Sequence, residues 1–173
     1  MPLRLILMRH AKSDWSNPSH TDHDRELNRR GRNAAGKMAD WLAAMDYKPN
    51  RMLCSSAMRT QQTANLMNHA WARPVDVGIE ENLYLASSGQ ILETIAAWAS
   101  DTHAATTPTL LVLGHNPGIS EAASRLSGEF CQMPTAAVIV LDCDVKSWAD
   151  PLKRELIDFV DEMVPKRLST DDS

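Results

Sequence analysis

The chain has 173 residues, of which 43% are hydrophobic and 23% are charged, a composition typical of a folded globular protein. Its formal net charge of -4 gives no overall basic field for nucleic acid or an anionic membrane, and no apolar run approaches the ~20 residues of a membrane span. Its three cysteines form no CxxC pair, so we expect reduced thiols in a cytoplasmic protein and no zinc site.

Hydrophobic periodicity predicts that strands and helices alternate along the chain. Apolar runs predict strands at Leu3–Met8, Met52–Cys54, Val75–Ile79, Thr109–Leu113, Ala136–Leu141 and Leu156–Val160. Apolar residues at helical spacing predict helices at about Asn28–Asp46, Ala57–Trp71, Ser88–Ala99 and Pro117–Leu126. The last strand segment would also fit a helix, and we favour a strand that pairs beside Ala136–Leu141.

This order of elements predicts an α/β fold. We expect a three-layer sandwich, in which helices flank a mostly parallel central sheet. We assign residues 1–165 to a single domain and residues 166–173 to a polar, frayed tail. In such sheets, functional residues gather where the strands end.

Cationic and imidazole side chains follow several of the predicted strands. Arg9 and His10 come directly after the first strand, Arg59 begins the helix after the second, and His115 follows the fourth. Because the carboxyl ends of parallel strands meet at the same edge of a sheet, we expect these side chains to converge. They would repel one another unless an anion lay between them, and guanidinium forks match phosphate oxygens. The sequence therefore predicts a site for a dianionic phosphate.

The residues at these strand ends resemble the motifs of a known family. In chain order they are Met8-Arg9-His10, Ser13, Trp15, Ser56–Ala64 (SAMRTQQTA) and Gly114-His115-Asn116. This set is similar to the histidine phosphatase superfamily, the phosphoglycerate mutase-like proteins, over residues 4 to about 126. The segment Arg25–Gly31 looks most like the SixA-type phosphohistidine phosphatases, and the resemblance implies the phosphoglycerate mutase-like fold.

The resemblance also implies a phosphatase that works through a covalent intermediate. His10 would be the nucleophile and form a phosphohistidine, while its other ring nitrogen donates to a backbone carbonyl. Arg9, Arg59 and His115 would hold the oxygens of the transferring group, and water would then release phosphate. These cationic groups would take the place of a metal ion, so we expect no metal and no other cofactor.

Glu81 is the candidate general acid, with Glu80 as the fallback. The family places a glutamate after its third strand with an aromatic residue three positions on, and Tyr84 fits that spacing. A phosphate ester needs this proton for its alkoxide leaving group. A phosphohistidine needs it less, because its imidazole can be protonated before the bond breaks.

Other polar residues near the motifs are candidate contacts to phosphate or substrate. We place Ser13, Arg25 and Asn116 in this group. Arg25 is equally able to form a structural pair with Asp22 or Asp24. Asn116 is also expected to act as the N-cap of the helix that follows it.

The loop after the first strand departs from the commoner family pattern. Lys12 stands where the family usually has a glutamate, and Ala11 replaces a glycine. Lys12 favours an anionic partner and argues against a sugar-phosphate mutase. His20 and His23 lie in the polar loop 13–25, where a solvated loop is a simpler interpretation than a metal site.

Three functions fit these residues. The favoured one is the removal of phosphate from a phosphohistidine on a partner protein. A small-molecule phosphomonoesterase is the alternative, and it would require Glu81. A phosphate-binding module without turnover is the third, although the intact set of Arg9, His10, Arg59 and His115 speaks against it. We expect neither nucleic acid nor a membrane as a partner.

Overall fold

A computed structural model of the chain describes residues 1–100 and 103–168. A six-stranded sheet with the order β3-β2-β4-β1-β5-β6 forms its middle layer. The strands are β1 (Leu3–Arg9), β2 (Arg51–Ser55), β3 (Asp76–Glu80), β4 (Thr109–Gly114), β5 (Val138–Cys143) and β6 (Ile157–Met163). The pairs among β3, β2, β4 and β1 are parallel, whereas β5 runs antiparallel to both of its neighbours. The predicted mostly parallel sheet is confirmed.

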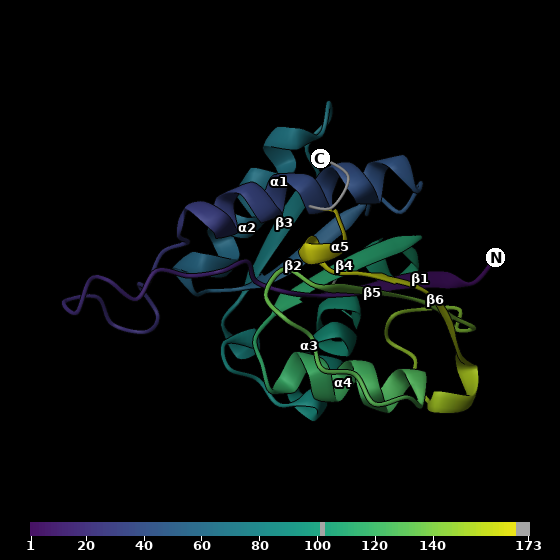
Figure 1. Ribbon diagram of the computed structural model, residues 1–173. Coiled ribbons are helices and arrows are strands. Elements are labelled where there is room, and N and C mark those ends of the chain that lie inside the picture. The colour runs from purple at the N-terminus through teal and green to yellow at the C-terminus, as the bar shows by residue number, and fades with distance from the viewer. Residues whose placement is uncertain (101–102, 169–173) are drawn as a thin grey trace.

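Helices cover both faces of this sheet, as Figure 1 shows. One face carries α1 (Arg29–Ala44), α2 (Met58–Ala70) and the short α5 (Pro165–Leu168), and the other carries α3 (Ser88–Ser100) and α4 (Gly118–Ser127). The connections include the 3-10 turns η1 (Glu81–Leu83), η2 (His103–Thr106) and η3 (Arg154–Leu156). The predicted three-layer α/β sandwich is therefore confirmed.

Strand β1 shows why a continuous apolar run forms the centre of the sheet. Leu5 and Leu7 pack into the core on the side of α3 and α4, whereas Ile6 and Met8 pack on the side of α1 and α2. All four side chains are fully buried. Successive residues of a strand point to opposite faces, so a strand covered on both faces must be apolar at every position. The first polar residue after this run is Arg9, at the end of the strand.

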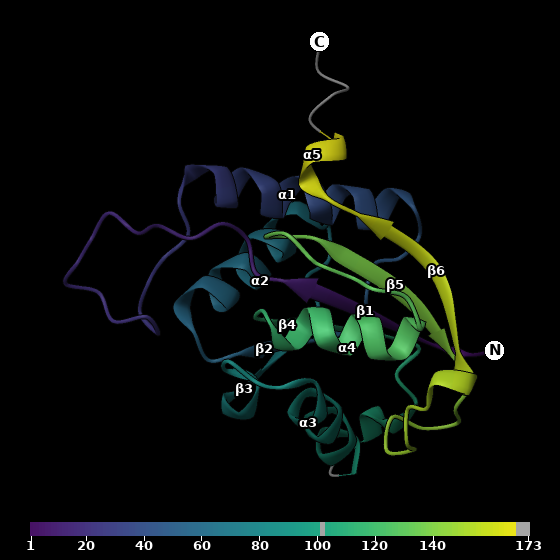
Figure 2. The same ribbon diagram turned by 60° about the horizontal axis from the view of Figure 1, so that its bottom comes forward.

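The carboxyl ends of β1, β2 and β4 lie at the same edge of the sheet. Arg9 pairs in register with Gly114, and Cys54 pairs with Leu113. In Figures 1 and 2 the long segment after β1 extends away from the sheet at this edge before it returns to α1. The edge therefore brings together the end of β1, the start of α2, the residues after β4 and one long loop.

The C-terminal region differs in part from the sequence-based expectation. The segment predicted at Leu156–Val160 is a strand and does pair beside β5. Residues 166–168, which we assigned to a frayed tail, belong to α5 and lie against α1 (Figure 2). Residues 169–173 of that predicted tail lie outside the described residues. No helix within 1–100 and 103–168 is long and apolar enough to cross a membrane.

Candidate active site

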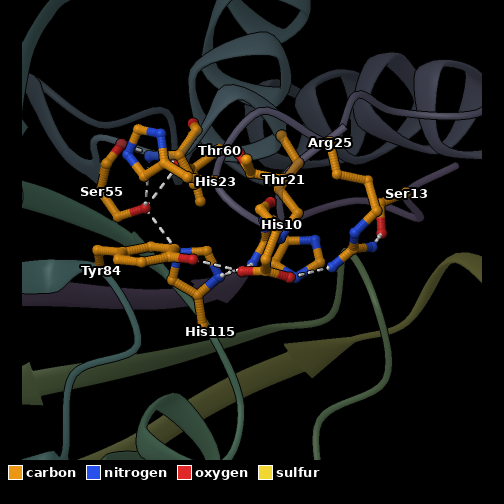
Figure 3. Close-up of polar contacts among 12 residues, drawn as sticks. His10, Ser13, Thr21, His23, Arg25, Ser55, Thr60, Tyr84 and His115 are labelled. Atoms are coloured by element: carbon orange, nitrogen blue, oxygen red, sulfur yellow. Dashed lines mark hydrogen bonds and ion pairs between the residues drawn. The ribbon is translucent and has the colours of Figure 1, made fainter. Parts of the chain in front are cut away.

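His10 lies just after β1, at the centre of the polar cluster in Figure 3. Its Nδ1 is 2.7 Å from the carbonyl oxygen of Ala11. Because a carbonyl only accepts, Nδ1 carries the proton, and Nε2 keeps its lone pair, as expected from the sequence. Burial, reinforced by the guanidinium of Arg59, lowers the pKa of His10 to about 4 despite this hydrogen bond. The ring is therefore neutral at neutral pH.

The backbone after His10 is held by α1 and α2. The Ala11 N–H donates to Thr63 Oγ1 at 3.1 Å, and that hydroxyl donates to the Arg59 carbonyl at 2.7 Å. A Cβ on Gly31, in the first turn of α1, would lie 2.0 Å from the Lys12 carbonyl oxygen. Only glycine permits this close approach. The His10 turn is thus clamped between two helices.

Arg59 is nearly completely buried, although its position in α2 would also suit a solvated side chain. Its Nη1 donates to the Asp22 carbonyl at 2.6 Å, and its Nη2 lies 3.1 Å from the Asp22 carboxylate. Arg25 Nη2 approaches the other oxygen of the same carboxylate at 2.9 Å. Arg9 Nη1 donates to the Met133 carbonyl at 3.2 Å. The structure thus brings Arg59 and Arg25 together around the carboxylate of a loop residue, whereas the hydrogen bond of Arg9 goes to Met133.

Asp22 and Tyr84 are members of this cluster that the sequence did not assign to the site, although Asp22 was considered as a partner of Arg25. The Tyr84 hydroxyl donates to the same Asp22 oxygen that Arg59 approaches. Burial opposes ionisation of Asp22, but hydrogen bonds from Tyr84, Arg25 and Arg59 hold the pKa of its carboxyl well below the usual range. Asp22 is therefore an anion, and it occupies the centre of the cationic cluster. In the sequence analysis, Tyr84 served only as the aromatic residue three positions after the candidate acid Glu81.

His115 lies on the opposite side of His10 from Arg25, edge-on to the Tyr84 ring (Figure 3). Its Nε2 is 2.6 Å from Ser55 Oγ, and its Nδ1 is 3.2 Å from Arg59 Nη2. Because a guanidinium only donates, Nδ1 is the acceptor, and Nε2 carries the proton of the neutral ring. Burial, reinforced by His10 and Arg59, lowers the pKa of His115 to about 3.

The loop that carries Asp22 docks on the start of α2. The His23 carbonyl accepts the Met58 N–H at 2.9 Å, and His23 Nε2 is 3.0 Å from Ser56 Oγ. The His23 ring also lies edge-on to Tyr84, with 4.9 Å between ring centroids. His23 therefore anchors the loop beside the cluster rather than standing free in solvent.

The further substrate contacts predicted from the sequence have structural partners. Ser13 Oγ accepts a hydrogen bond from Arg25, whose guanidinium carbon lies 3.6 Å from the ring centroid of the exposed Trp15. Arg25 thus forms the structural pair with Asp22 considered for it, within the cluster where a substrate contact was the other prediction.

The predicted helix cap at Asn116 is wrong. Helix α4 begins at Gly118, and Pro117 occupies the N-cap position without a side-chain hydrogen bond. The Asn116 amide instead donates to the Met133 carbonyl at 2.9 Å and accepts from the Ser120 hydroxyl. These contacts turn the side chain away from the helix N–H groups and tie β4 to the residues before β5.

Glu81 lies outside the cluster that surrounds His10. It is exposed in η1 and lines a pocket of about 500 Å³ together with Asn82, Tyr84 and Glu93. It makes no hydrogen bond or ion pair with His10, Arg59 or His115 in the part of the chain that the structure describes. From this segment, Tyr84 is the side chain that reaches the cluster.

The charges of the cluster suit a doubly charged anion. Three arginines and one aspartate, with both histidines neutral, leave a surplus of two positive charges. Across the described ranges, the buried side-chain nitrogens and oxygens without a hydrogen-bond partner are Nε of Arg9, Arg25 and Arg59. A phosphoryl group carries about -1.5 to -2 charges and three acceptor oxygens, which would match these donors. Among residues 1–100 and 103–168, no three His, Cys, Asp or Glu side chains are grouped to hold a metal ion.

Comparisons with known proteins agree with this geometry. Residues 5–103 match the family model for the histidine phosphatase superfamily, branch 1. An uncharacterised chloroplast protein of Arabidopsis thaliana is 34% identical over 155 residues, which cover 85% of this chain and 69% of that protein. An uncharacterised protein of Mycobacterium tuberculosis is 35% identical over 158 residues, covering 83% of this chain and 90% of the relative.

Solved structures of the same fold include proteins assigned as the phosphohistidine phosphatase SixA. The one from Agrobacterium tumefaciens has a TM-score of 0.77 and 29% identity, and the match covers 95% of this chain and 99% of that chain. The one from Nakamurella multipartitia has a TM-score of 0.79 and 26% identity, covering 95% and 97%. The chain belongs to the histidine phosphatase superfamily and is similar to its SixA-type members.

Proposed function

We propose that this protein is a phosphatase that transfers the phosphoryl group of a phosphohistidine on a partner protein to His10 and then to water. The observation that carries the proposal is the state of His10. Its Nδ1–H is bound by the Ala11 carbonyl, and its ring is neutral beside three arginines. The lone pair on Nε2 is therefore available for attack on phosphorus.

The proposed reaction has two displacements at phosphorus. In the first, His10 Nε2 forms a bond to phosphorus, and the bond between phosphorus and the substrate imidazole breaks. The electron pair of that bond stays with the departing ring, which leaves as a neutral imidazole when its other nitrogen is already protonated. In the second, water attacks phosphorus, the bond to His10 breaks, and inorganic phosphate and one proton are released.

The surrounding cations would stabilise the transferring group. Arg59 and Arg25 already hold an anion, because both bind the Asp22 carboxylate. A phosphoryl group would take over these donors when Asp22 moves away, and the free Nε of Arg9 would add another. His115 lies 5.2 Å from His10 between ring centroids, close enough to contact the same group. Donors fixed before the reaction stabilise developing charge most effectively.

A phosphohistidine substrate is supported by the position of Glu81. An alkoxide leaving group needs an acid within hydrogen-bond reach, and Glu81 is exposed, with no hydrogen bond or ion pair to the described residues around His10. An imidazole leaving group does not need that acid. The connection between β3 and α3 spans only residues 81–87, so no cap is inserted there over the site. The SixA-assigned structures at 26–29% identity support the same substrate class.

The test is a trap for the phosphoenzyme. The protein would be mixed with a histidine-containing phosphotransfer domain phosphorylated on its histidine, quenched rapidly in alkali and analysed by mass spectrometry. We expect alkali-stable phosphate on His10, release of inorganic phosphate, and loss of both in His10→Asn. His69→Asn, at an exposed histidine of α2, is the matched control and should behave as wild type.

Other outcomes would change the proposal. Turnover of small esters but not of the phosphodomain would favour a phosphomonoesterase. Binding of inorganic phosphate without turnover of either substrate would point to a phosphate-binding module. Phosphate found on a residue other than His10 would refute the assigned nucleophile.

A further inference from the structure

A groove of about 600 Å³ lies beside the catalytic cluster. Lys12 forms one wall, the solvent side of α1 forms another, and α5 and the residues before β5 close it. Figure 2 shows α5 lying over α1. The groove is separate from the cluster around His10, since none of its lining residues holds Asp22.

This groove is cationic, although the chain as a whole carries a net charge of -4. Its charged lining residues are Lys12, Arg30, Lys37 and Lys166. All four are exposed to solvent, and the described residues that line the groove include no aspartate or glutamate. A local excess of one charge attracts ligands of the opposite charge even when the whole protein repels them.

The groove shares its backbone with the catalytic turn. Lys12 is two residues after His10, so their Cα atoms lie within about 7 Å of each other. The Ala136 N–H donates to the His10 carbonyl at 3.0 Å, which places the groove residue Thr135 next to the same turn. The close approach of Gly31 to the Lys12 carbonyl fixes α1 there as well. One wall of the groove therefore belongs to the same turn as His10, so a protein surface that covers His10 would also lie close to the groove.

The spacing of the cations indicates the size of the occupant. Arg30 and Lys37 are seven residues apart in α1, which corresponds to about 10 Å along the helix axis. A single phosphoryl group is too small to contact both, whereas several carboxylates on a protein surface match this spread. We propose that the groove binds an acidic surface of the phosphoprotein that presents its phosphohistidine to His10. This inference rests on the proposed function, and it adds that the partner protein is acidic around its phosphohistidine.

The test uses two synthetic phosphohistidine peptides that differ only in their flanking residues, glutamates in one and glutamines in the other. At low salt we expect wild type to dephosphorylate the glutamate peptide with a kcat/KM about tenfold higher, and the preference to shrink as salt screens the charges. The double variant Arg30→Glu/Lys37→Glu should lose the preference and keep its activity on the glutamine peptide.

The matched control is Lys146→Glu/Lys153→Glu. It changes the net charge equally at two exposed lysines between β5 and β6, at the sheet end opposite the site, where Cys143 pairs with Leu3. We expect this control to keep the preference for the glutamate peptide. Equal kcat/KM for both peptides in wild type would overturn the inference. Survival of the preference in the groove variant, or its loss in the control, would overturn it too.

A binding measurement separates this inference from the proposed function. Fluorescence anisotropy would report the affinity of the labelled, unphosphorylated glutamate peptide for each protein. If neither phosphopeptide is turned over, the proposed function fails. Weaker binding by the groove variant alone would then still support the acidic docking surface, and equal binding by all proteins would refute it.

Discussion

The catalytic cluster has a sheet side and a loop side, and they are held in different ways. The sheet side comprises Arg9, His10, Arg59 and His115, and the loop side comprises Asp22, His23 and Arg25. Sheet-side residues follow buried strands or begin α2, and Arg59 and His115 are each 2% exposed. The Asp22 side chain is 43% exposed and is held by ion pairs and hydrogen bonds to the arginines and Tyr84.

This difference separates the sheet-side donors, which are preorganised, from the Asp22 carboxylate, which a phosphoryl group could replace. The sheet side is fixed by the core and by backbone contacts, so its donors are in place before a substrate arrives. Arg25 contacts Ser13, Asp22 and Trp15, all within the same loop, so its position depends on that loop and not on the sheet. The Asp22 carboxylate binds the arginine donors that a phosphoryl group would use. Asp22 is therefore an internal competitor of phosphate for these arginines.

The largest effect that tests this comparison comes from removing one arginine on each side. We expect Arg59→Ala to lower kcat on the phosphorylated phosphotransfer domain by about 10³-fold, because it removes a fixed donor. Arg25→Ala should cost only about tenfold, because its donor is positioned by the loop and not by the core. Steady-state kinetics, with circular dichroism to verify folding, would measure both losses. Equal losses would show that the two sides are equally preorganised.

A second effect concerns the buried neutral state of His10 on the sheet side. Its pKa falls from 6.5 to about 4 on folding, so the unfolded chain binds more protons between these values. The free energy of unfolding should therefore fall as the pH drops through this window. The contribution of His10 between pH 7 and 4.5 is about 2 kcal/mol. Urea unfolding would show His10→Asn losing less stability than wild type over that range, and identical pH profiles would contradict the burial effect.

The sheet side could be predicted from the sequence because its signals are local. Each residue sits directly after an apolar run or at the start of a helix, and parallel strands place such ends at one edge. The backbone at Ala11 does not need the conformational freedom of glycine, since the described non-glycine residues with positive φ are Asp46, Leu85 and Ala136. Alanine thus replaces the usual glycine there without backbone strain.

On the loop side, Arg25 and its pairing with Asp22 were considered, but the contacts of Asp22 with Arg59 and Tyr84 could not be predicted, because they cross the chain. Asp22 meets Tyr84 across 62 positions and Arg59 across 37. An irregular loop has no hydrophobic periodicity, so its sequence does not indicate which part of the fold it contacts. Asn116 illustrates the same limit, since a local capping signal was overridden by the Met133 carbonyl, 17 positions away. Local patterns therefore predicted the sheet-side residues, whereas tertiary contacts determine that the Asp22 carboxylate binds Arg59.

A third test, smaller in effect, addresses the internal competitor directly. We expect Asp22→Asn to bind inorganic phosphate about tenfold more tightly, because the neutral amide competes less well for two guanidinium groups. Asp24→Asn is the matched control, since this exposed loop carboxylate contacts His23 and not the arginines. Isothermal titration calorimetry would measure both affinities. Unchanged or weaker phosphate binding by Asp22→Asn would mean that Asp22 supports the bound anion instead of competing with it.

The smallest expected effect concerns Glu81, which lies beyond Tyr84 and outside both sides of the cluster. Glu81→Gln should change kcat on the phosphorylated phosphotransfer domain by less than about twofold, since an imidazole leaving group needs no enzyme acid. Glu93→Gln, in the same pocket, is the control for a change of charge there.

The informative comparison is between the kcat values of the same variants on two substrates, one that releases an imidazole and one that releases an alkoxide. A small phosphate ester expels an alkoxide, so any role of Glu81 as a proton donor would appear as a loss of kcat on the ester alone. A loss of kcat on both substrates would place Glu81 in a step that they share, such as the attack of water on the His10 intermediate. An unchanged kcat on both would show that neither the imidazole nor the alkoxide leaving group takes its proton from Glu81.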